Sequence, residues 1–411
     1  MRASHREHSD GEMMSFLESR QQVAPQGIGK PVRRREDARF LTGAGKYADD
    51  MNLPGQAYAY VVRSPHAHAR IAGIDVGPAA GAPGVLAILT GRDATADGLQ
   101  PIPHRPVPTN PHEVPLKSRD GSPFFTAPHP VLALGKTRYV GEPVAVVVAE
   151  TLWLAMDAAE RLAIEYALLP TVTRSVDALA PGAPLVWEEH GANLCVDSET
   201  GDKAAPELAF TQAAHVVRLE AAINRVTGVP MELRAAVGTY DAAAVQYTLY
   251  TSAGGGVVRQ RDDIAAVLGV PAAAVRLVSG DVGGNFGIRN ITYPELALVA
   301  WAARRVGRPV KWLCDRRDAF ATDFHGRDLP PRRSLRLISM AASSPSGRST
   351  PAIWARVPSL LSRSPRGSPF PPASTTSHAP TCVAVRWSRT PPRPRPIAAP
   401  AAPRSCSSSS V

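Results

Sequence analysis

The chain changes character near residue 329, and this break limits how much of it can form a folded core. Residues 329–411 contain twelve Arg but no Lys, Asp or Glu, and they hold 16 of the 40 prolines together with 18 serines. No amphipathic period continues through the segment. Because such a composition buries too little apolar surface to offset the loss of chain entropy, we expect residues 329–411 to be a disordered tail.

The net charge of +10 belongs to this tail and not to the rest of the chain. Residues 1–328 carry 34 basic and 36 acidic side chains, which gives them a net charge of −2. A strongly basic protein suggests a nucleic-acid partner, but the tail has few aromatic side chains that could stack on bases. We therefore expect no nucleic acid among the partners.

The sequence also lacks the signals of membrane and secreted proteins. It has no run of about 18 apolar residues, so we expect no membrane span, and the N-terminus has no apolar secretory segment. The four cysteines lie far apart and form no CxxC pair: Cys195, Cys314, Cys382 and Cys406. This usage fits a reducing, cytoplasmic setting without disulfides.

Four segments follow one another along the chain. Residues 1–27 are polar and unpatterned, and we expect them to be a flexible N-terminus. Residues 28–170 and 171–328 each mix strand and helix patterns, and residues 329–411 form the tail. The expected fold is therefore α+β, with two folded blocks between two irregular ends.

Local patterns predict individual elements in both blocks. The apolar run 143–149 predicts a buried strand, and apolar residues at helical spacing from Leu152 to Tyr166 predict a helix. In the second block, Tyr247–Thr251 alternates as a strand does, and Pro294–Val306 has the good helix formers and the N-terminal proline of a helix.

Two glycine-rich loops follow predicted strands in the second block. One is Gly254-Gly255-Gly256, and the other is Gly283-Gly284-Asn285-Phe286-Gly287. Glycines allow the backbone to approach a ligand closely and to turn its N–H groups toward an anion, and the phenylalanine could form a wall of such a site. Neither loop has the G-x-G-x-x-G spacing of a dinucleotide site or the Gly-Lys-Ser/Thr of a P-loop. Structural turns without a ligand are the alternative interpretation.

The residues alone predict no metal bound by protein side chains. His66 and His68 occupy alternate positions, as on one face of a strand, but no third ligand is evident nearby. Cys314 comes at the end of a predicted strand, and we expect it to be a small buried hydrophobic residue rather than a nucleophile.

The order of several motifs resembles that of one protein family. The motifs run without interruption over about residues 28–328: Val32–Gly43, Gly45–Asp50, Arg63–Ala69, Tyr139–Ala145, Asp157–Glu160, Pro230–Ala236, Gly280–Gly287, Tyr293–Glu295 and His325–Asp328. This order is similar to that of the molybdopterin-binding large subunits of the xanthine dehydrogenase and aldehyde oxidase family. Within that family, the chain looks most like the large chain of aerobic carbon monoxide dehydrogenase.

The resemblance implies a fold and a cofactor. It implies an α/β-hammerhead domain over residues 28–170, followed by the first part of a molybdopterin-binding domain over residues 171–328. It implies a molybdenum–pterin cytosine dinucleotide, whose dithiolene and not the protein holds the metal. Many members carry a Gln in the first glycine loop, and this sequence has none there. The cofactor-binding residues carried over from the family are Gly254, Gly255, Gly256, Gly283, Gly284, Asn285, Phe286, Gly287 and Arg289.

The resemblance also implies a reaction and partners. The reaction is oxidation of an aldehyde, an N-heterocycle or carbon monoxide, with water as the oxygen source. Electrons pass to an iron–sulfur small subunit and an FAD-binding medium subunit, and the intact enzyme is a dimer of heterotrimers. The family's catalytic Glu lies near the end of a chain about twice this long, so we expect no catalytic residue in this sequence.

The tail is expected to result from a one-nucleotide frameshift near Leu329–Arg332. Codons can be chosen for Arg333–Ala342 so that the neighbouring reading frame encodes Ala-Glu-Leu-Ala-Leu-Asp-Leu-Asp-Gly-Arg. This peptide resembles the sequence of the family at this point. Ile397–Val411 permits Tyr-Arg-Ser-Ala-Gly-Arg-Pro-Glu-Val-Met-Phe-Val-Ile-Glu in the same frame. On this hypothesis the chain is a truncated fragment and is inactive. The alternative hypothesis is a non-catalytic binding or scaffold protein that keeps the hammerhead domain.

Overall fold

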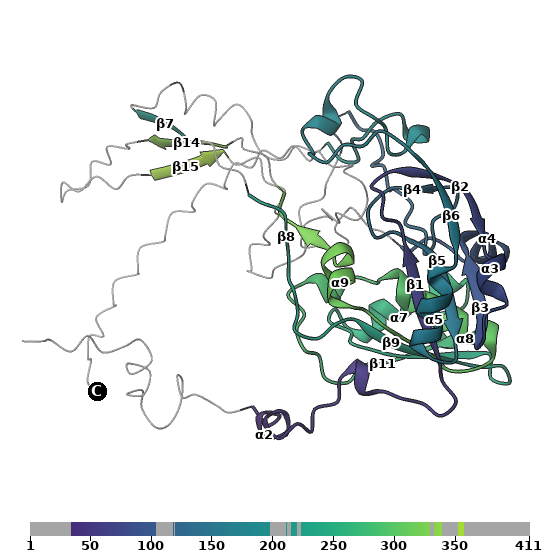
Figure 1. Ribbon diagram of the computed structural model, residues 1–411. Coiled ribbons are helices and arrows are strands. Elements are labelled where there is room, and N and C mark those ends of the chain that lie inside the picture. Colours follow the sequence, from purple (N-terminus) through teal and green to yellow (C-terminus); the bar gives the residue numbers. More distant parts are fainter. Residues whose placement is uncertain are drawn as a thin grey trace, which may run out of the picture. The chain divides into compact units, whose positions relative to one another are not determined.

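The computed structural model describes residues 34–103, 118, 120–197, 211, 215–219, 223–328, 333–338 and 352–356. The chain divides into two units, Met1–Lys46 and Tyr47–Val411. Among the described residues of the first unit there is one short helix, α2 (Asp37–Leu41). The second unit carries the sheets and helices that follow (Figure 1).

A seven-stranded sheet organises the second unit and joins the two sequence blocks. Its strand order is β11 (Val275–Val278), β10 (Gln246–Thr251), β9 (Ala235–Asp241), β12 (Val310–Leu313), β1 (Ala57–Arg63), β5 (Pro143–Ala149) and β3 (Val85–Thr90). The blocks meet where β1 pairs in parallel with β12, with Ala57 opposite Val310. The N–H of Ala57 extends this contact by donating to the carbonyl of Pro309 at 2.7 Å. Residues far apart in the sequence therefore share one continuous sheet.

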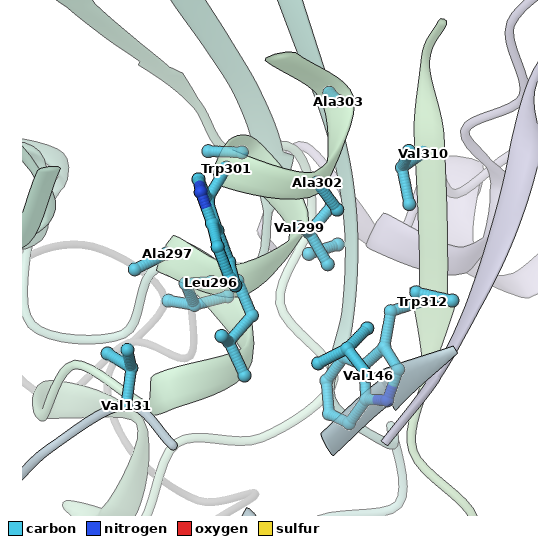
Figure 2. Close-up of a cluster of buried hydrophobic side chains, with 14 of the residues drawn as sticks. Val131, Val146, Leu296, Ala297, Val299, Trp301, Ala302, Ala303, Val310 and Trp312 are labelled. Atoms are coloured by element: carbon cyan, nitrogen blue, oxygen red, sulfur yellow. The ribbon is translucent and has the colours of Figure 1, made fainter. Parts of the chain in front are cut away.

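Strand β5 is buried along its whole length because both of its faces are covered. Val146 and Val148 belong to the large core that includes α8 (Pro294–Val306), whereas Val147 and Ala149 pack in a second cluster with α5 (Leu152–Glu160). Figure 2 shows Val146 near Trp312 of β12, in the cluster that also contains Trp301 of α8. The uninterrupted apolar sequence of β5 is the pattern expected for a strand that is covered on both faces.

Helix α8 is the central helix of the large core. Its first ten residues, Pro294 to Ala303, are all buried, and Gly307 ends the helix in the left-handed conformation. Tight packing requires glycine on the facing strand. A Cβ atom at Gly238 of β9 would lie 2.8 Å from the carbonyl oxygen of Val299. The helix predicted from Pro294 to Val306 is confirmed.

The predicted helix from Leu152 to Tyr166 is wrong in its second half. Helix α5 ends at Glu160, and Ala163–Leu168 forms strand β6, which pairs antiparallel with β2 (Ala69–Asp75). The apolar residues at helical spacing also fit an alternating strand, and pairing with β2 decided between the two. This three-stranded sheet is completed by β4 (Lys136–Thr137).

Two smaller sheets involve the C-terminal part of the described chain. Strand β13 (His325–Gly326) pairs with β8 (Val226–Thr227). Strand β14 (Arg333–Ile338) lies between β7 (His215–Leu219) and β15 (Ala352–Arg356). Two segments of the region for which composition predicts disorder are therefore strands. The other residues from 329 to 411 lie outside the described residues, as do residues 1–33.

The remaining helices are short, apart from α7. They are η1 (Ala48–Asp50), α3 (Gly77–Ala80), α4 (Gly91–Ala96), η2 (Asp177–Leu179), η3 (Glu188–His190), α7 (Val257–Leu268), η4 (Ala272–Ala274), η5 (Ile288–Asn290) and α9 (Arg316–Thr322). Across the part of the chain that the structure describes, no helix combines the length and the apolar character needed to cross a bilayer. The mixed α and β architecture expected from the sequence is confirmed.

Candidate functional site

The two glycine loops, which are separated in sequence by α7 and β11, lie against each other. The N–H of Gly254 donates to the carbonyl of Arg289 at 3.3 Å, and the side-chain amide of Asn285 donates to the carbonyl of Gly254 at 3.0 Å. The approach leaves no room for a side chain at the first two glycines of the first loop. A Cβ at Gly254 would lie 2.5 Å from the Cβ of Arg289, and one at Gly255 would lie 2.8 Å from the backbone of Asn290.

The second loop has a backbone that favours glycine and contains N–H groups without a protein acceptor in the described part of the chain. Gly284, Phe286 and Gly287 have φ angles of 121°, 50° and 90°. A non-glycine residue with positive φ is strained, and such residues cluster at functional sites. Within the described residues, the backbone N–H groups of Gly284, Asn285 and Phe286 donate to no protein acceptor. Successive free N–H groups of this kind form an anion-binding concavity.

Asn285 holds the second loop in this conformation. Its carbonyl oxygen accepts a hydrogen bond from the N–H of Gly287 at 3.1 Å, and its amide nitrogen also donates to the Oδ1 of Asn290 at 2.8 Å. Phe286, in contrast, projects outward and is 72% exposed. The phenyl ring of Phe286 is therefore exposed, while the Asn285 side chain binds Gly254, Gly287 and Asn290.

Arg289 places a buried positive charge behind the loops. Its side chain donates from Nη2 to the carbonyl of Glu232, its Nε has no hydrogen-bond partner, and the residue is 3% exposed. Among the described residues, no carboxylate lies within ion-pair distance of it. Burial lowers the pKa of Arg289, although Glu232 acts in the opposite direction. A buried cation without an ion-pair partner is costly, and an anion at this site would relieve the cost.

Two further residues that sequence reasoning missed support the loops. Glu232 accepts hydrogen bonds from the N–H of Gly283 at 2.7 Å and from the hydroxyl of Ser252. Gln260 of α7 is 2% exposed and donates to the carbonyl of Arg289 at 3.0 Å, while its own carbonyl oxygen has no partner. Glu232 lies in the motif Pro230–Ala236, but nothing in its local sequence indicated a contact with Gly283, which lies 51 residues later.

A buried ion network fixes the elements beneath the site. Arg234, immediately before β9, pairs with Glu295 of α8 at 2.7 Å and with Asp323 at 2.8 Å. Arg63 of β1 also pairs with Glu295 at 2.7 Å. Burial alone would raise the pKa of Glu295, but the two guanidinium groups outweigh it and lower that pKa to about 2. Glu295 is therefore a carboxylate at neutral pH and fastens α8 to the sheet.

The residues set aside as metal ligands or nucleophiles lie elsewhere and have structural contacts. His66 packs edge-on against Tyr166, and the Nδ1 of His68 is 3.0 Å from the carbonyl oxygen of Pro170. No group of three or more His, Cys, Asp or Glu side chains in the described residues could hold a metal ion. Cys314 is 1% exposed, as predicted, and burial raises the pKa of its thiol to about 12.

Two family models match consecutive parts of the chain. Residues 42–170 match the a/b hammerhead domain of aldehyde oxidase and xanthine dehydrogenase, and residues 186–332 match the molybdopterin cofactor-binding domain. The second match contains both glycine loops together with Glu232 and Arg289.

Curated relatives and solved structures agree with these matches. The chain is 37% identical to the 6-hydroxypseudooxynicotine dehydrogenase complex subunit gamma of Paenarthrobacter nicotinovorans, over 75% of this chain and 37% of the relative. It is 34% identical to the carbon monoxide dehydrogenase large chain of Hydrogenophaga pseudoflava, over 74% of this chain and 38% of the relative. The crystal structure of quinoline 2-oxidoreductase from Pseudomonas putida 86 is 35% identical, with a TM-score of 0.65 over 75% of this chain and 37% of that chain.

The matched region is only part of each of these relatives. The chain spans less than two fifths of the length of each of these three proteins. The two family models nevertheless follow each other in the expected order, and they cover most of the described residues. The chain therefore belongs to the xanthine dehydrogenase and aldehyde oxidase family of molybdopterin-binding large subunits.

Proposed function

We propose that residues 252–291 hold one side of a molybdenum–pterin cofactor, in its cytosine dinucleotide form, within an oxidoreductase. The observation that carries this proposal is that two features occur in the same short segment. The backbone N–H groups of Gly284–Phe286 have no protein acceptor among the described residues, and the buried guanidinium of Arg289 has no ion-pair partner there. Both features suit an anionic group that approaches the backbone closely. The described residues therefore fit a phosphate-bearing cofactor whose metal has no protein ligand.

Each residue of the site has a separate role in this proposal. Gly254 and Gly255 allow the loops to pack closely, and the N–H groups from Gly284 to Phe286 bind negative charge. Asn285 holds these groups in position, and the exposed ring of Phe286 excludes water from one side of the bound group. When bound, the molybdenum–pterin group supplies two-electron oxidation with oxygen taken from water.

The substrate and partners belong to the same proposal. We take the substrate to be an aldehyde, an N-heterocycle or carbon monoxide, because the relatives include carbon monoxide dehydrogenase and quinoline 2-oxidoreductase. An iron–sulfur small subunit and an FAD-binding medium subunit would accept the electrons, in a dimer of heterotrimers. Support for partner subunits comes from the relative described as subunit gamma of a dehydrogenase complex. A cytoplasmic location is supported by the buried thiol of Cys314, which forms no disulfide.

We also propose that the chain carries a frameshift and is inactive. Support comes from the loss of every acidic residue after Asp328, whereas residues 1–328 carry 36. Sequencing the coding DNA tests the frameshift directly: an open shifted frame through position 411 supports it, and early stop codons in that frame contradict it.

Cofactor content tests the proposed function. The frame-restored protein, expressed in a host that makes the cofactor, should contain molybdenum and a pterin cytosine dinucleotide, measured by elemental analysis and chromatography. Arg289→Ala should lose molybdenum, whereas Arg276→Ala, which removes an exposed arginine from β11, should retain it. Absence of molybdenum from the wild-type protein would contradict the proposal and favour a scaffold role, and equal retention by both variants would exclude Arg289 from the site.

A further inference from the structure

Glu232 connects both glycine loops to one point of the chain. Its Oε2 accepts the N–H of Gly283 at 2.7 Å, and its Oε1 accepts the hydroxyl of Ser252, two residues before Gly254. Oε1 also lies 3.4 Å from the N–H of Ala48, at the start of η1. One carboxylate thus contacts three segments that are separated by up to 235 residues in the sequence.

The backbone of Glu232 adds to these contacts. Its N–H donates to the carbonyl of Gly283 at 3.3 Å, and its carbonyl accepts from the Nη2 of Arg289. Gly283 packs directly on this residue, because a Cβ there would lie 2.5 Å from the Cβ of Glu232. The position of the second loop is therefore set by both the backbone and the side chain of Glu232.

The hydrogen-bond partners show which role the carboxylate has. Gly283 and Ala48 are N–H donors, and the hydroxyl of Ser252 donates as well, so both carboxylate oxygens act as acceptors. A group with both oxygens occupied is poorly placed to take a proton from a substrate. Hydrogen bonds from N–H and O–H donors to an ionised carboxylate are stronger than neutral ones, which suits a residue that holds loops in place.

We propose that Glu232 is a positioning residue that fixes the Ser252–Gly256 and Gly283–Arg289 loops in their binding conformation before any ligand arrives. The two loops also contact each other through Asn285 and Gly254, but Glu232 ties both of them to the segment that leads into β9. The inference rests on the proposed function only in taking these loops as the cofactor site. The order of the loops themselves can be measured without a cofactor.

Amide hydrogen exchange of the full chain without cofactor tests the proposal. Glu232→Ala should accelerate exchange of the hydrogen-bonded amides within residues 279–287 and 252–256 by roughly 10-fold or more, which is the scale expected for loss of a charge-assisted hydrogen bond. These amides are those of Gly283, Gly287, Ala253 and Gly254. Exchange in β5 should not change, because β5 has no contact with Glu232 among the described hydrogen bonds. Glu165→Ala, which removes an exposed glutamate from β6, is the matched control and should exchange as the wild type does.

Two further variants separate the contact of Glu232 with Ser252 from its contact with Gly283. Ser252→Ala removes only the hydroxyl and should accelerate residues 252–256 while residues 279–287 stay protected. Glu232→Gln keeps one oxygen that can accept from Gly283, so it should restore most of the protection of residues 279–287 that the alanine variant loses. A role in packing alone would not produce this rescue at one loop.

The exchange rates of the two loops in the Glu232 variants decide whether the proposal holds. Exchange in both loops within about 2-fold of wild type in Glu232→Ala, a difference far below that expected for a lost hydrogen bond, would overturn the proposal. If the alanine variant also loses protection in β5, the glutamine variant decides: protection restored at residues 279–287 supports the proposal, and exchange there as fast as in the alanine variant overturns it. Wild-type protein that binds no molybdenum–pterin cofactor would contradict the proposed function, whereas the exchange result would stand independently.

Discussion

Arg234 and Glu295 form an ion pair at 2.7 Å in which the two side chains are only 4% and 1% exposed. Arg234 also lies 4.0 Å from the ring centroid of Tyr293, and Glu295 receives a second guanidinium from Arg63. The network thus joins β1, the segment before β9, and the first turn of α8. Because α8 follows the second glycine loop and η5 in the sequence, this network anchors the element to which the C-terminal end of that loop leads.

Glu295→Gln should strongly destabilise the protein. The variant leaves the buried charges of Arg63 and Arg234 without their shared carboxylate, and breaking a buried ion pair costs about 3–5 kcal/mol. Urea unfolding of wild type and variant measures the difference. Arg174→Ala, which removes an exposed pair with Asp177, is the control and should change stability by no more than about 0.5 kcal/mol. A loss below about 1 kcal/mol for Glu295→Gln would show that the network is dispensable.

Glu142→Gln should remove a pH dependence of stability. Burial raises the pKa of Glu142 to about 7, although the N–H and charge of Arg138 act against this. Because the folded-state pKa lies above the usual value, the folded protein binds the proton more tightly than the unfolded chain. The resulting stability is present below the usual pKa of about 4.5, and it is lost as pH rises through about 7.

The size of this effect can be measured by unfolding at several pH values. For wild type, the Glu142 contribution should fall by on the order of 3 kcal/mol between pH 4.5 and pH 8. The glutamine variant should gain stability relative to wild type as pH rises, since its side chain does not ionise. Parallel pH profiles for the two proteins would contradict the prediction. Measurements should stay above pH 4.5, because the stability that ionised Glu295 contributes to the folded protein is lost as pH falls from 4.5 toward about 2.

Gly238→Ala should destabilise the contact between β9 and α8. An added Cβ would lie 2.8 Å from the carbonyl oxygen of Val299 and 3.0 Å from the N of Ala300, which are rigid helix backbone atoms. Overpacking of this kind costs about 1–3 kcal/mol. Gly81→Ala is the control, because a Cβ there meets nothing within 4 Å and no positive φ is required. Equal midpoints of thermal unfolding for the two variants would contradict the prediction.

Local sequence predicted the elements whose burial is uniform, but it could not predict which distant segments meet. The apolar run of β5 and the helix formers of α8 identified these elements because each is buried along nearly all of its length. Helix α5 was overextended because the residues of β6 satisfy two periodicities, and only the pairing with β2 decides between them.

The same distinction applies to the site. The glycines of both loops could be identified because close backbone approach requires this residue type. The contacts of Glu232 with Ser252 and Gly283 could not be predicted, since they depend on the parallel alignment of β10 and β11, which brings the ends of both strands together. The absence of a partner for the Arg289 Nε likewise appears only in three dimensions.

Gly254→Ala should impair the site while it leaves the fold intact. A Cβ at this position would lie 2.5 Å from the Cβ of Arg289 and 2.7 Å from the Cγ of Asn285, so the loops must separate. Gly326→Ala is the matched control, because its added Cβ meets nothing within 4 Å and its φ is not positive. In the frame-restored protein, molybdenum retained per chain should fall by ~10-fold or more in Gly254→Ala, which corresponds to about 1.4 kcal/mol of lost binding free energy. Because the altered loop lies outside the strands of the main sheet, urea midpoints of the two variants should agree, and equal molybdenum retention would show that close packing of the loops is not needed for binding.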